Sequence, residues 1–376
     1  MSVVSVRLSV GDRIPAFNLP SQTGEYFNIG DFAGKPLVIC FFPNPLTPDC
    51  IAQAREIQTL LPQLEAIGVN LIGVSPTPVE VLQNFAQTHQ LQFKLLSDPK
   101  GALCQEYGIL YGNAQNQSLT VARQTFVVNI DLRIIKVYNT VDPHQHASQL
   151  LEDLQALLAT EVPRHITRQA PVLLIPNVFD REFCQHLINI WHTQGNGESG
   201  FMRQVNGQTV GLIDHSHKIR RDHFLQNGET KERIRYLFGK RVTPEIWKAY
   251  CFNVTRFEDF RIVGYDASRG GYFRPHRDNT TAGTAHRRFA MTINLNAGEY
   301  EGGYLRFPEY GPHLYRPDTG SAVVFSCSLL HEATDVTAGL RFALLTFFYG
   351  EREAQIRDEY RKRNQGSEDQ NQAYQP

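Results

Sequence analysis

The pattern of predicted strands and helices changes near residue 160, and this change constrains the fold more than any other feature of the chain. Before it, short apolar runs alternate with amphipathic stretches, which predicts an α/β layer around a central sheet. From Ile262 onward, short strands separated by Gly and Pro turns predominate, which predicts a β-sandwich or jelly roll. A chain of 376 residues is long enough to form two such units.

The first part begins with a short apolar strand and a long amphipathic helix. The run from Pro36 to Phe42 is rich in β-branched and aromatic residues, as in a buried strand. From Ile51 to Ile67, apolar residues recur every three or four positions, as on one face of a helix, and Pro62 predicts a kink in it. Further expected elements are a strand at 70–74, a helix at 79–90, a hairpin at 125–138 turning near Asp131, and a helix at 146–160.

These patterns divide the chain into four segments. We expect an α/β domain at 1–160, a polar linker at 161–171, and a mainly β domain with flanking helices at 172–350. The tail at 351–376 is charged, rich in Gln and Asn, and almost free of large aliphatic residues. It is expected to begin as a frayed helix and to continue as disorder.

The composition of the chain limits the classes of binding partner and the cellular compartment that we expect. The 37 basic and 38 acidic residues give a net charge of −1, without the basic excess typical of nucleic-acid binders. No stretch approaches the ~20 apolar residues of a spanning helix, and the N-terminus lacks a secretory-signal pattern. The 6 cysteines show no paired spacing that would indicate a disulfide framework or zinc knuckle. We expect a cytoplasmic protein without nucleic-acid or membrane partners, and a homodimer stays open.

One cysteine stands where a thiol becomes reactive. Cys50 closes the segment that starts at Pro43, between the apolar strand and the long helix. Backbone N–H groups without intrahelical partners and the helix dipole favour a thiolate at a helix start. Cys50 is therefore a candidate nucleophile. Thr47 can place a hydroxyl beside its sulfur, and a distant Arg can supply positive charge.

The segment from Pro43 through Thr47 to Cys50, placed after an apolar strand, resembles the active-site loop of peroxiredoxins of the AhpC/TSA type. The resemblance extends over about residues 8–160 and implies a thioredoxin-like fold. It also implies that Cys50 attacks peroxide while Thr47 and Arg123 orient the O–O bond, with Pro43 in the same loop.

The other thiols leave the catalytic cycle open. Arg55 stands five residues after Cys50, where one common resolving arrangement has a cysteine, and Cys104 is either a resolving thiol or a core residue. Cys40 lies inside the apolar strand and is expected to be packed. These observations favour a one-cysteine cycle with an external thiol reductant. Alternatively, the domain is a non-catalytic binding, dimerising or redox-sensing module.

A second constellation lies in the later, strand-rich part. His276 and Asp278 stand two apart, so their side chains leave a strand from the same face, and His331 follows far downstream. Two imidazoles and one carboxylate leave coordination positions open, which suits non-haem Fe(II) and oxygen chemistry. Arg341 opens an apolar strand and can bind a carboxylate with its guanidinium fork.

This constellation resembles the Fe(II)/2-oxoglutarate dioxygenase superfamily over about residues 170–350, closest in layout to its prolyl 4-hydroxylase-like branch. The matching residues are the iron ligands His276, Asp278 and His331, then Arg341 for the distal carboxylate of 2-oxoglutarate, Tyr265 in the co-substrate pocket, and the Gly-Gly strand at Gly302. The resemblance implies a double-stranded β-helix that hydroxylates a substrate C–H while 2-oxoglutarate is decarboxylated to succinate. It also implies ascorbate as reductant and a small-molecule or peptidyl substrate.

Two alternatives remain for this domain: a barrel that binds a redox-inert metal, or a sensor that binds 2-oxoglutarate without turnover. A polar stretch contains His215, His217 and His223 beside Lys218, Arg220 and Arg221. It favours a loop over the barrel mouth rather than a metal cluster, and its basic residues either face solvent or hold an anionic substrate. Further histidines are expected at the surface, namely His144, His146, His286 and His313.

Overall fold

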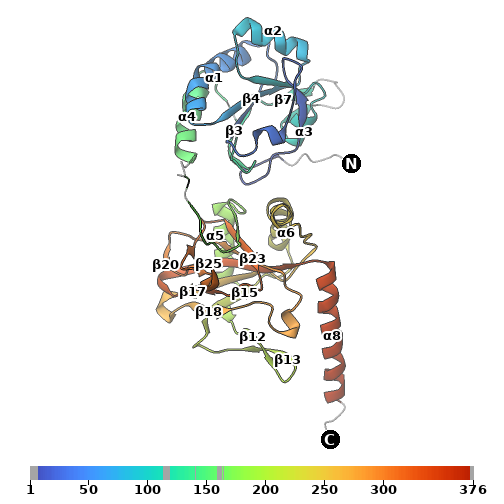
Figure 1. The fold of residues 1–376 in the computed structure, drawn as a ribbon, viewed down its shortest axis with the longest axis vertical. Helices are drawn as coiled ribbons and strands as arrows, with labels where there is room; N and C mark the ends of the chain where they lie inside the picture. Colours follow the sequence, from blue (N-terminus) through green and yellow to red (C-terminus); the bar gives the residue numbers. More distant parts are fainter. Residues whose placement is uncertain (1–6, 113–118, 140, 159–162, 164, 373–376) are drawn as a thin grey trace. The chain divides into compact units, whose positions relative to one another are not determined.

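The computed structural model of the protein describes residues 7–112, 119–139, 141–158, 163 and 165–372 (Figure 1). The chain divides into two compact units, residues 1–163 and 164–376. Among the helices of the described residues, none is long and apolar enough to cross a membrane.

The first unit is built on one mixed sheet of five strands. Their order is β5 (Lys94–Ser97), β4 (Asn70–Ser75), β3 (Leu37–Phe41), β8 (Thr125–Val128) and β9 (Ile134–Tyr138). The first three strands run parallel to one another, whereas β8 and β9 are antiparallel additions that form a hairpin. The central position of β3 explains why every one of its residues is buried.

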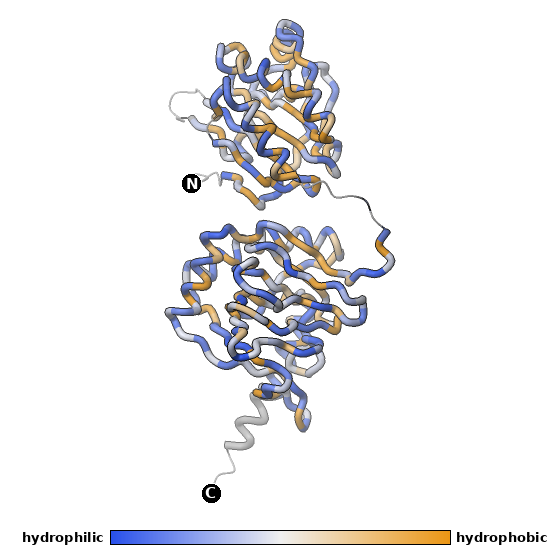
Figure 2. Tube along the Cα trace, turned by 90° about the vertical axis from the view of Figure 1, so that its left-hand side faces the viewer, coloured by the Kyte–Doolittle hydropathy of each residue, from blue (hydrophilic) through white to orange (hydrophobic). Residues whose placement is uncertain are grey.

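Alternate residues of β3 face two different hydrophobic cores. Val38 and Cys40 pack with α1 (Pro48–Ala66), α2 (Val79–His89) and α4 (His146–Leu157). The intervening residues Leu37, Ile39 and Phe41 pack with α3 (Ala102–Glu106) and the N-terminal segment. The remaining elements are β1 (Asn18–Pro20), β2 (Tyr26–Asn28), η1 (Ile29–Phe32), β6 (Leu110–Gly112) and β7 (Leu119–Val121). In Figure 2 the hydrophobic segments run through the inside of this unit.

The strands and helices predicted for this unit are confirmed, with small shifts at their ends. Helix α1 starts three residues before Ile51 and continues as one element through Pro62. The hairpin turns at Leu132, which adopts a positive φ of 65° next to the predicted Asp131. One surface prediction is wrong: His146 is buried and bonded to Thr125, because α4 lies on the sheet with its first turn.

The second unit is strand-rich, as predicted, and contains two large antiparallel sheets. The nine-stranded sheet consists of β10 (Leu173–Ile175), β23 (Ala322–Ser326), β19 (Phe289–Asn294), β25 (Val336–Tyr349), β17 (Arg261–Asp266), β15 (Arg221–Phe224) and β11 (Gly197–Glu198), with β16 (Arg256–Phe257) and β20 (Tyr300–Gly302) on β25. The five-stranded sheet consists of β14 (Lys218–Ile219), β18 (Tyr272–His276), β24 (His331–Ala333), β21 (Leu305–Arg306) and β22 (Leu314–Tyr315). The double-stranded β-helix stays a prediction.

Helices cover the outside of the larger sheet, and a hairpin extends from the unit. Helices α5 (Arg181–Thr193), α6 (Glu229–Arg241) and α7 (Thr243–Tyr250) contribute to the main core with β17, β19 and β25. The hairpin consists of β12 (Phe201–Val205) and β13 (Gln208–Leu212). The short 3-10 helices are η2 (Ala267–Arg269), η3 (Ala282–Thr284) and η4 (Pro308–Tyr310).

The tail differs from the expectation of disorder, because residues Glu351–Gln372 form helix α8 (Figure 1). Its first turn is held by an ion pair of 3.1 Å between Glu353 and Arg288. Farther along, the Tyr360 hydroxyl accepts a hydrogen bond of 3.1 Å from the Thr209 backbone N–H of β13. Helix α8 is thus held by a few polar contacts rather than by an apolar stripe. Residues 373–376 lie outside the described part.

Candidate active sites

Cys50 lies in the first turn of α1, as the sequence predicts, and its side chain is fully buried. The helix begins at Pro48, directly after Thr47. Proline suits this first position because it has the required φ and lacks an N–H group that the helix could not use. The sulfur is therefore near the N-terminal end of the helix dipole, which favours negative charge.

Arg123 provides a cation next to this sulfur. It stands in the link between β7 and β8, and its Nη2 donates to Cys50 Sγ over 3.5 Å while Nη1 donates to Asp49 Oδ2 over 3.3 Å. Burial alone lowers the pKa of Arg123, but the contacts with Cys50 and then Asp49 outweigh it and raise that pKa. Its buried Nε has no hydrogen-bond partner among the described residues. The structure therefore brings Cys50 and Arg123 together, as predicted from the sequence.

The loop before the helix is fixed by its own hydrogen bonds. The Thr47 hydroxyl donates to the Asn44 carbonyl over 2.9 Å, and the Leu46 backbone N–H donates to Asn44 Oδ1 over 3.0 Å. Pro43 lies half-buried between β3 and this loop. A hydroxyl that donates to the backbone keeps its lone pairs available, so Thr47 can still accept a hydrogen bond from a peroxide.

The other thiols of this unit, Cys40 and Cys104, are buried and have raised pKa values. Cys104 packs in the core on one face of the sheet, whereas Cys50 packs in the core on the other face. Burial first, and then the nearby Asp98 carboxylate, raise the pKa of Cys104. Burial also raises the pKa of Cys40 to about 12. This placement favours Cys104 as a core residue over Cys104 as a resolving thiol.

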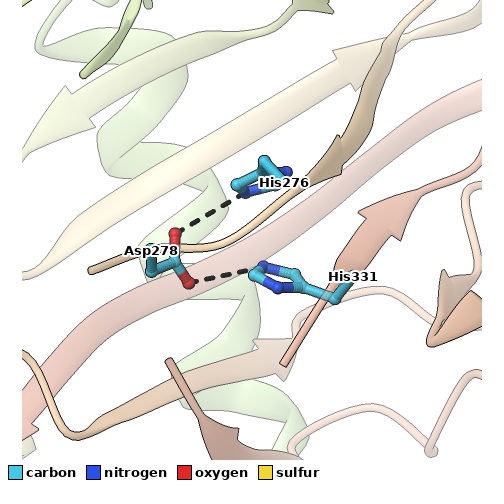
Figure 3. A group of neighbouring side chains, drawn as sticks. All are labelled: His276, Asp278 and His331. Carbon is cyan, nitrogen blue, oxygen red and sulfur yellow. Dashed lines mark ion pairs between the residues drawn. The ribbon is translucent and has the colours of Figure 1, made fainter. Parts of the chain in front are cut away.

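In the second unit, the three residues His276, Asp278 and His331 converge (Figure 3). His276 ends β18 and pairs in register with His331, which begins β24. Asp278 follows β18 and lies 3.6 Å from His276 Nε2 and 3.3 Å from His331 Nε2 through its two oxygens. One potential ligand atom from each residue lies within 4.8 Å of the others. This is the only such His, Cys, Asp or Glu group among the described residues.

Hydrogen bonds orient both imidazoles toward the carboxylate. His276 Nδ1 is 2.8 Å from the carbonyl oxygen of Arg274, and His331 Nδ1 is 3.0 Å from that of Leu329. A carbonyl oxygen only accepts, so each Nδ1 carries the proton and each Nε2 presents a lone pair. Bonds of this kind set the tautomer of metal-ligating histidines.

The electrostatics also keep these groups ready to bind a cation. Burial lowers the pKa of His331 to about 4, so its imidazole is neutral at pH 7. Burial alone raises the pKa of Asp278, but the neighbouring His331, His276 and Arg287 side chains outweigh it and lower that pKa. The site therefore offers two imidazole nitrogens and one carboxylate as ligands.

Arg341 lies on β25 and faces the same cavity as the three residues. Its Nη2 donates to Asn294 over 3.3 Å, and its guanidinium lies 5.1 Å from the ring centre of Tyr265, the residue opposite it on β17. Its buried Nε has no hydrogen-bond partner in the described part of the chain. Gly303, with φ of 63°, makes room for it, because a Cβ there would meet Arg341 Cδ at 2.7 Å.

The cavity, of about 330 Å³, lies between the two large sheets and the β12–β13 hairpin. Sequence analysis missed several of its residues. The Thr292 hydroxyl is buried and unpartnered within the described structure, and the Phe273 ring stacks on His276 with centres 3.5 Å apart. Arg261 lies two strand positions from Val263 and four from Tyr265, so the alternation of β17 could have placed it on the cavity face.

The basic stretch before the metal-binding residues is a loop only in its first part, since His215 and His217 lie in a turn and strands begin at Lys218. Lys218 begins β14 and Arg221 begins β15, and these strands pair with β18 and β17. From Lys218 onward the expectation was wrong because charged residues here are buried on strands, which removes the apolar pattern. His215 is an exposed partner of Glu198, so it belongs to no metal cluster. His286 was also expected at the surface, but it is buried against Glu258.

Comparisons with known proteins match a part of each unit to a family. Residues 10–137 match the model of the AhpC/TSA family, and residues 260–349 match that of the 2OG-Fe(II) oxygenase superfamily. Peroxiredoxin Bcp of Escherichia coli is 32% identical over 151 residues, which are 39% of this chain and 96% of that protein. Peroxidoxin BcpB from Mycobacterium tuberculosis, a crystal structure, shares 28% sequence identity with this chain, and the two superimpose with a TM-score of 0.39. The match covers 41% of this chain and 100% of the BcpB chain.

Proposed function

The chain belongs to the peroxiredoxin family through its first unit and carries a 2OG-Fe(II) oxygenase domain in its second, and from this we propose that both units are catalytic. The oxygenase family implies Fe(II) and 2-oxoglutarate. The proposed reaction of the second unit is hydroxylation of a substrate C–H bond. The observation that carries it is the convergence of His276, Asp278 and His331 in one cavity with Arg341.

The donor set fits Fe(II). His276 and His331 present their Nε2 atoms, and Asp278 presents a carboxylate oxygen toward each of them. Two histidines and one carboxylate leave open positions for further ligands, as in non-haem Fe(II) oxygenases. When bound, the metal with its co-substrate would supply the oxidising power for C–H hydroxylation.

The cavity also fits a dicarboxylate. The buried Nε of Arg341 and the buried hydroxyl of Thr292 lack partners within the described structure, and a buried unpaired donor costs about 1–3 kcal/mol. A carboxylate at Arg341 would remove that cost through charge-assisted hydrogen bonds. We assign Arg341 to the distal carboxylate of 2-oxoglutarate. Tyr265, in contact with Arg341, then forms the wall of the co-substrate pocket.

The finer specificity rests on sequence layout. The order of the ligands and the position of Arg341 ten residues after His331 support a prolyl 4-hydroxylase-like enzyme, with a peptidyl or small-molecule substrate. Ascorbate belongs to the proposal as the reductant that keeps the iron ferrous.

Succinate formation tests the oxygenase proposal. The full chain, supplied with Fe(II), ascorbate and 2-oxoglutarate under air, is expected to release succinate, and His331→Ala is expected to reduce this to background. A wild type that binds 2-oxoglutarate in the presence of metal but never releases succinate would instead support the sensor alternative.

For the first unit, we infer a one-cysteine thiol peroxidase. The Cys50 thiolate attacks one peroxide oxygen, so an S–O bond forms, the O–O bond breaks, and the second oxygen leaves as an alcohol or water after taking a proton. Arg123 stabilises the thiolate, and we assign the hydroxyl of Thr47 to hold the peroxide. One external thiol then forms a mixed disulfide and releases water, and a second thiol frees Cys50 and leaves as a disulfide.

The distance between Cys50 and Cys104, on opposite faces of the sheet, supports the external reductant. Consumption of peroxide with a small dithiol as the reductant tests this part of the proposal. A wild type that binds no peroxide and stays reduced at Cys50 would leave the unit as a binding module.

A further inference from the structure

Lys218 and Arg261 are basic side chains of the oxygenase cavity that, like Arg341, lack a carboxylate partner of their own among the described residues. Arg220 is bound to Asp222 by two hydrogen bonds of 2.7 and 2.6 Å, and Arg287 is bound to Glu258 by two of 2.6 and 2.9 Å. Both of these guanidinium groups are thus fully paired with a carboxylate, whereas Lys218 and Arg261 are not.

Lys218 is buried and bonded only to neutral groups. Its Nζ donates to Ser199 Oγ over 2.7 Å and to the Gly200 carbonyl over 2.6 Å, and it lies 4.8 Å from the centre of the Phe273 ring. Burial first, and then the charge of Arg220, lower the pKa of Lys218 to about 6. An anion beside this amine would stabilise its protonated form.

Arg261 has only a share in a carboxylate that is already occupied. Its Nη2 lies 3.6 Å from Glu258, which accepts the two bonds from Arg287 and lies 2.9 Å from His286. The Nε of Arg261 is buried and has no hydrogen-bond partner among the described residues. The cavity therefore presents a buried N–H donor on a cation at this end as well as at Arg341.

The two ends are too far apart for one co-substrate. Arg341 pairs in register with Tyr265, while Arg261, on the same strand as Tyr265, pairs with Leu345. Four residues along a strand separate the Cα atoms of its first and last positions by about 13 Å. Arg341 is bonded to Asn294 and Arg261 contacts Glu258, so each is held at its own end. A five-carbon dicarboxylate, with bonds of about 1.5 Å, can bind at one end only.

The charges also leave room for a second anion. Fe(II) and 2-oxoglutarate carry opposite charges of equal size, and Asp278 balances Arg341. Lys218 on β14 and Arg261 on β17 come from different sheets and line the same cavity. They can therefore contact one ligand from two sides.

Resting on the proposed oxygenase function, we propose that the C–H substrate is a small organic acid whose anionic group, carboxylate or phosphate, binds between Lys218 and Arg261. The cavity volume of about 330 Å³ favours a small molecule, because drug-sized ligands occupy cavities of about 300–1,000 Å³. The acidic group would then lie at the end of the cavity away from Arg341.

Equilibrium dialysis of the full chain tests this, with radiolabelled acetate and sulfate as the two probes, at constant ionic strength. Acetate stands for carboxylates and sulfate for phosphates, so their relative affinity distinguishes the two sources of the anion. In wild type without metal we expect two anion sites. In protein loaded with Mn(II) and 2-oxoglutarate we expect one.

The variants assign these sites. Arg341→Met should remove the site that 2-oxoglutarate occupies, whereas Lys218→Met or Arg261→Met should weaken the other at least tenfold. Arg261→Lys keeps the charge and should retain binding, which separates loss of charge from misfolding. Arg181→Met, an exposed residue at the start of α5, serves as the matched control and should bind as wild type does.

The outcomes separate the two proposals. If loaded wild type takes up no anion, or if Lys218→Met and Arg261→Met both bind as wild type does, the acidic-substrate proposal is wrong. If metal and 2-oxoglutarate do not bind but the Lys218 and Arg261 variants still lose an anion, the oxygenase proposal fails and the anion site stands.

Discussion

The two candidate sites are assembled over very different lengths of chain. At the thiol site, the start of one helix supplies Cys50 and its partial positive charge, and a single distant residue, Arg123, completes the surroundings of the sulfur. At the metal-binding site, His276 and His331 meet only because β18 and β24 pair in one register. The first site therefore depends mainly on local backbone, and the second on the pairing of distant strands.

This difference predicts how the sites respond to change. A local site should lose chemistry when one side chain is removed, while the helix persists. The metal-binding site, whose ligands are brought together by strand pairing, should lose metal affinity after a single substitution. The peroxidase activity of the first unit should not change.

The largest effect is expected for Cys50→Ser. Removing the nucleophile should lower peroxide consumption by at least ~10³, since nothing else in the unit supplies a reactive sulfur in the same position. Peroxide disappearance with a dithiol measures this, and succinate release should stay at the wild-type level. Cys251→Ser, which removes an exposed thiol, is the control. Equal losses in both variants would mean that consumption comes from nonspecific thiol oxidation.

Asp278→Ala should reduce metal affinity by more than ~100-fold, because even outer-shell partners of a metal ligand contribute about 10–100-fold. Titration of Mn(II), followed by electron paramagnetic resonance, measures the affinity. Asp358→Ala removes an exposed carboxylate of α8 and should bind as wild type does. Retained affinity in Asp278→Ala would contradict the assignment of the three ligands.

Arg341→Met is expected to act on the co-substrate alone. Loss of a buried charged hydrogen bond costs about 2 kcal/mol or more, so the affinity for 2-oxoglutarate should fall by about 30-fold or more. Calorimetry with the Mn(II)-loaded protein measures this, and Mn(II) affinity should not change. Arg352→Met, on an exposed position of α8, provides the comparison. An unchanged 2-oxoglutarate affinity would assign its carboxylate to another cation.

Arg123→Met should slow peroxide consumption by at least about tenfold, a smaller effect than loss of the thiol, because a hydrogen bond to a charged group such as the Cys50 thiolate contributes about 1.5–3 kcal/mol. Alkylation of Cys50 by iodoacetamide at pH 7 should slow in parallel. If peroxide consumption slows while alkylation does not, Arg123 acts on the peroxide rather than on the thiolate.

The smallest effect is expected for Cys104→Ser. Cys104 lies in the opposite core from Cys50, so peroxide consumption with an external thiol should stay within about twofold of wild type. Mass spectrometry of the oxidised wild type should find Cys50 as a sulfenic acid or a mixed disulfide. An intramolecular Cys50–Cys104 disulfide would show that α3 rearranges during the cycle.

The sequence predicted most of both sites, for different reasons. Cys50 and Thr47 follow from a short segment between an apolar strand and an amphipathic helix, where local rules apply, whereas Arg123 lies far along the chain and was placed by the resemblance. His276, Asp278 and His331 required a resemblance as well, because the spacing of His276 and Asp278 says nothing of which strand pairs with theirs. Arg341 was placed by the same resemblance, from its position ten residues after His331.

The remaining residues were missed where burial overrides polarity. Arg261 is charged, which suggests solvent, yet strand pairing turns it toward the cavity. Lys218, for which the sequence left solvent and an anionic ligand open, also lines the cavity. His286 and His146 were likewise assigned to the surface, although each has a polar partner inside the fold. Composition also suggested a disordered tail, because the contacts that hold α8 are single side chains rather than a hydrophobic stripe.

That tail matters for anyone who shortens the protein. Ending the chain at residue 350 would remove the Tyr360 hydroxyl that receives the Thr209 N–H of β13. Strand β13 in turn pairs with β12, which supplies Phe201, Met202 and Arg203 to the cavity wall. A protein that ends at residue 350 would therefore lose a contact that holds the cavity wall in place. Its substrate preference should then differ from that of the 376-residue chain.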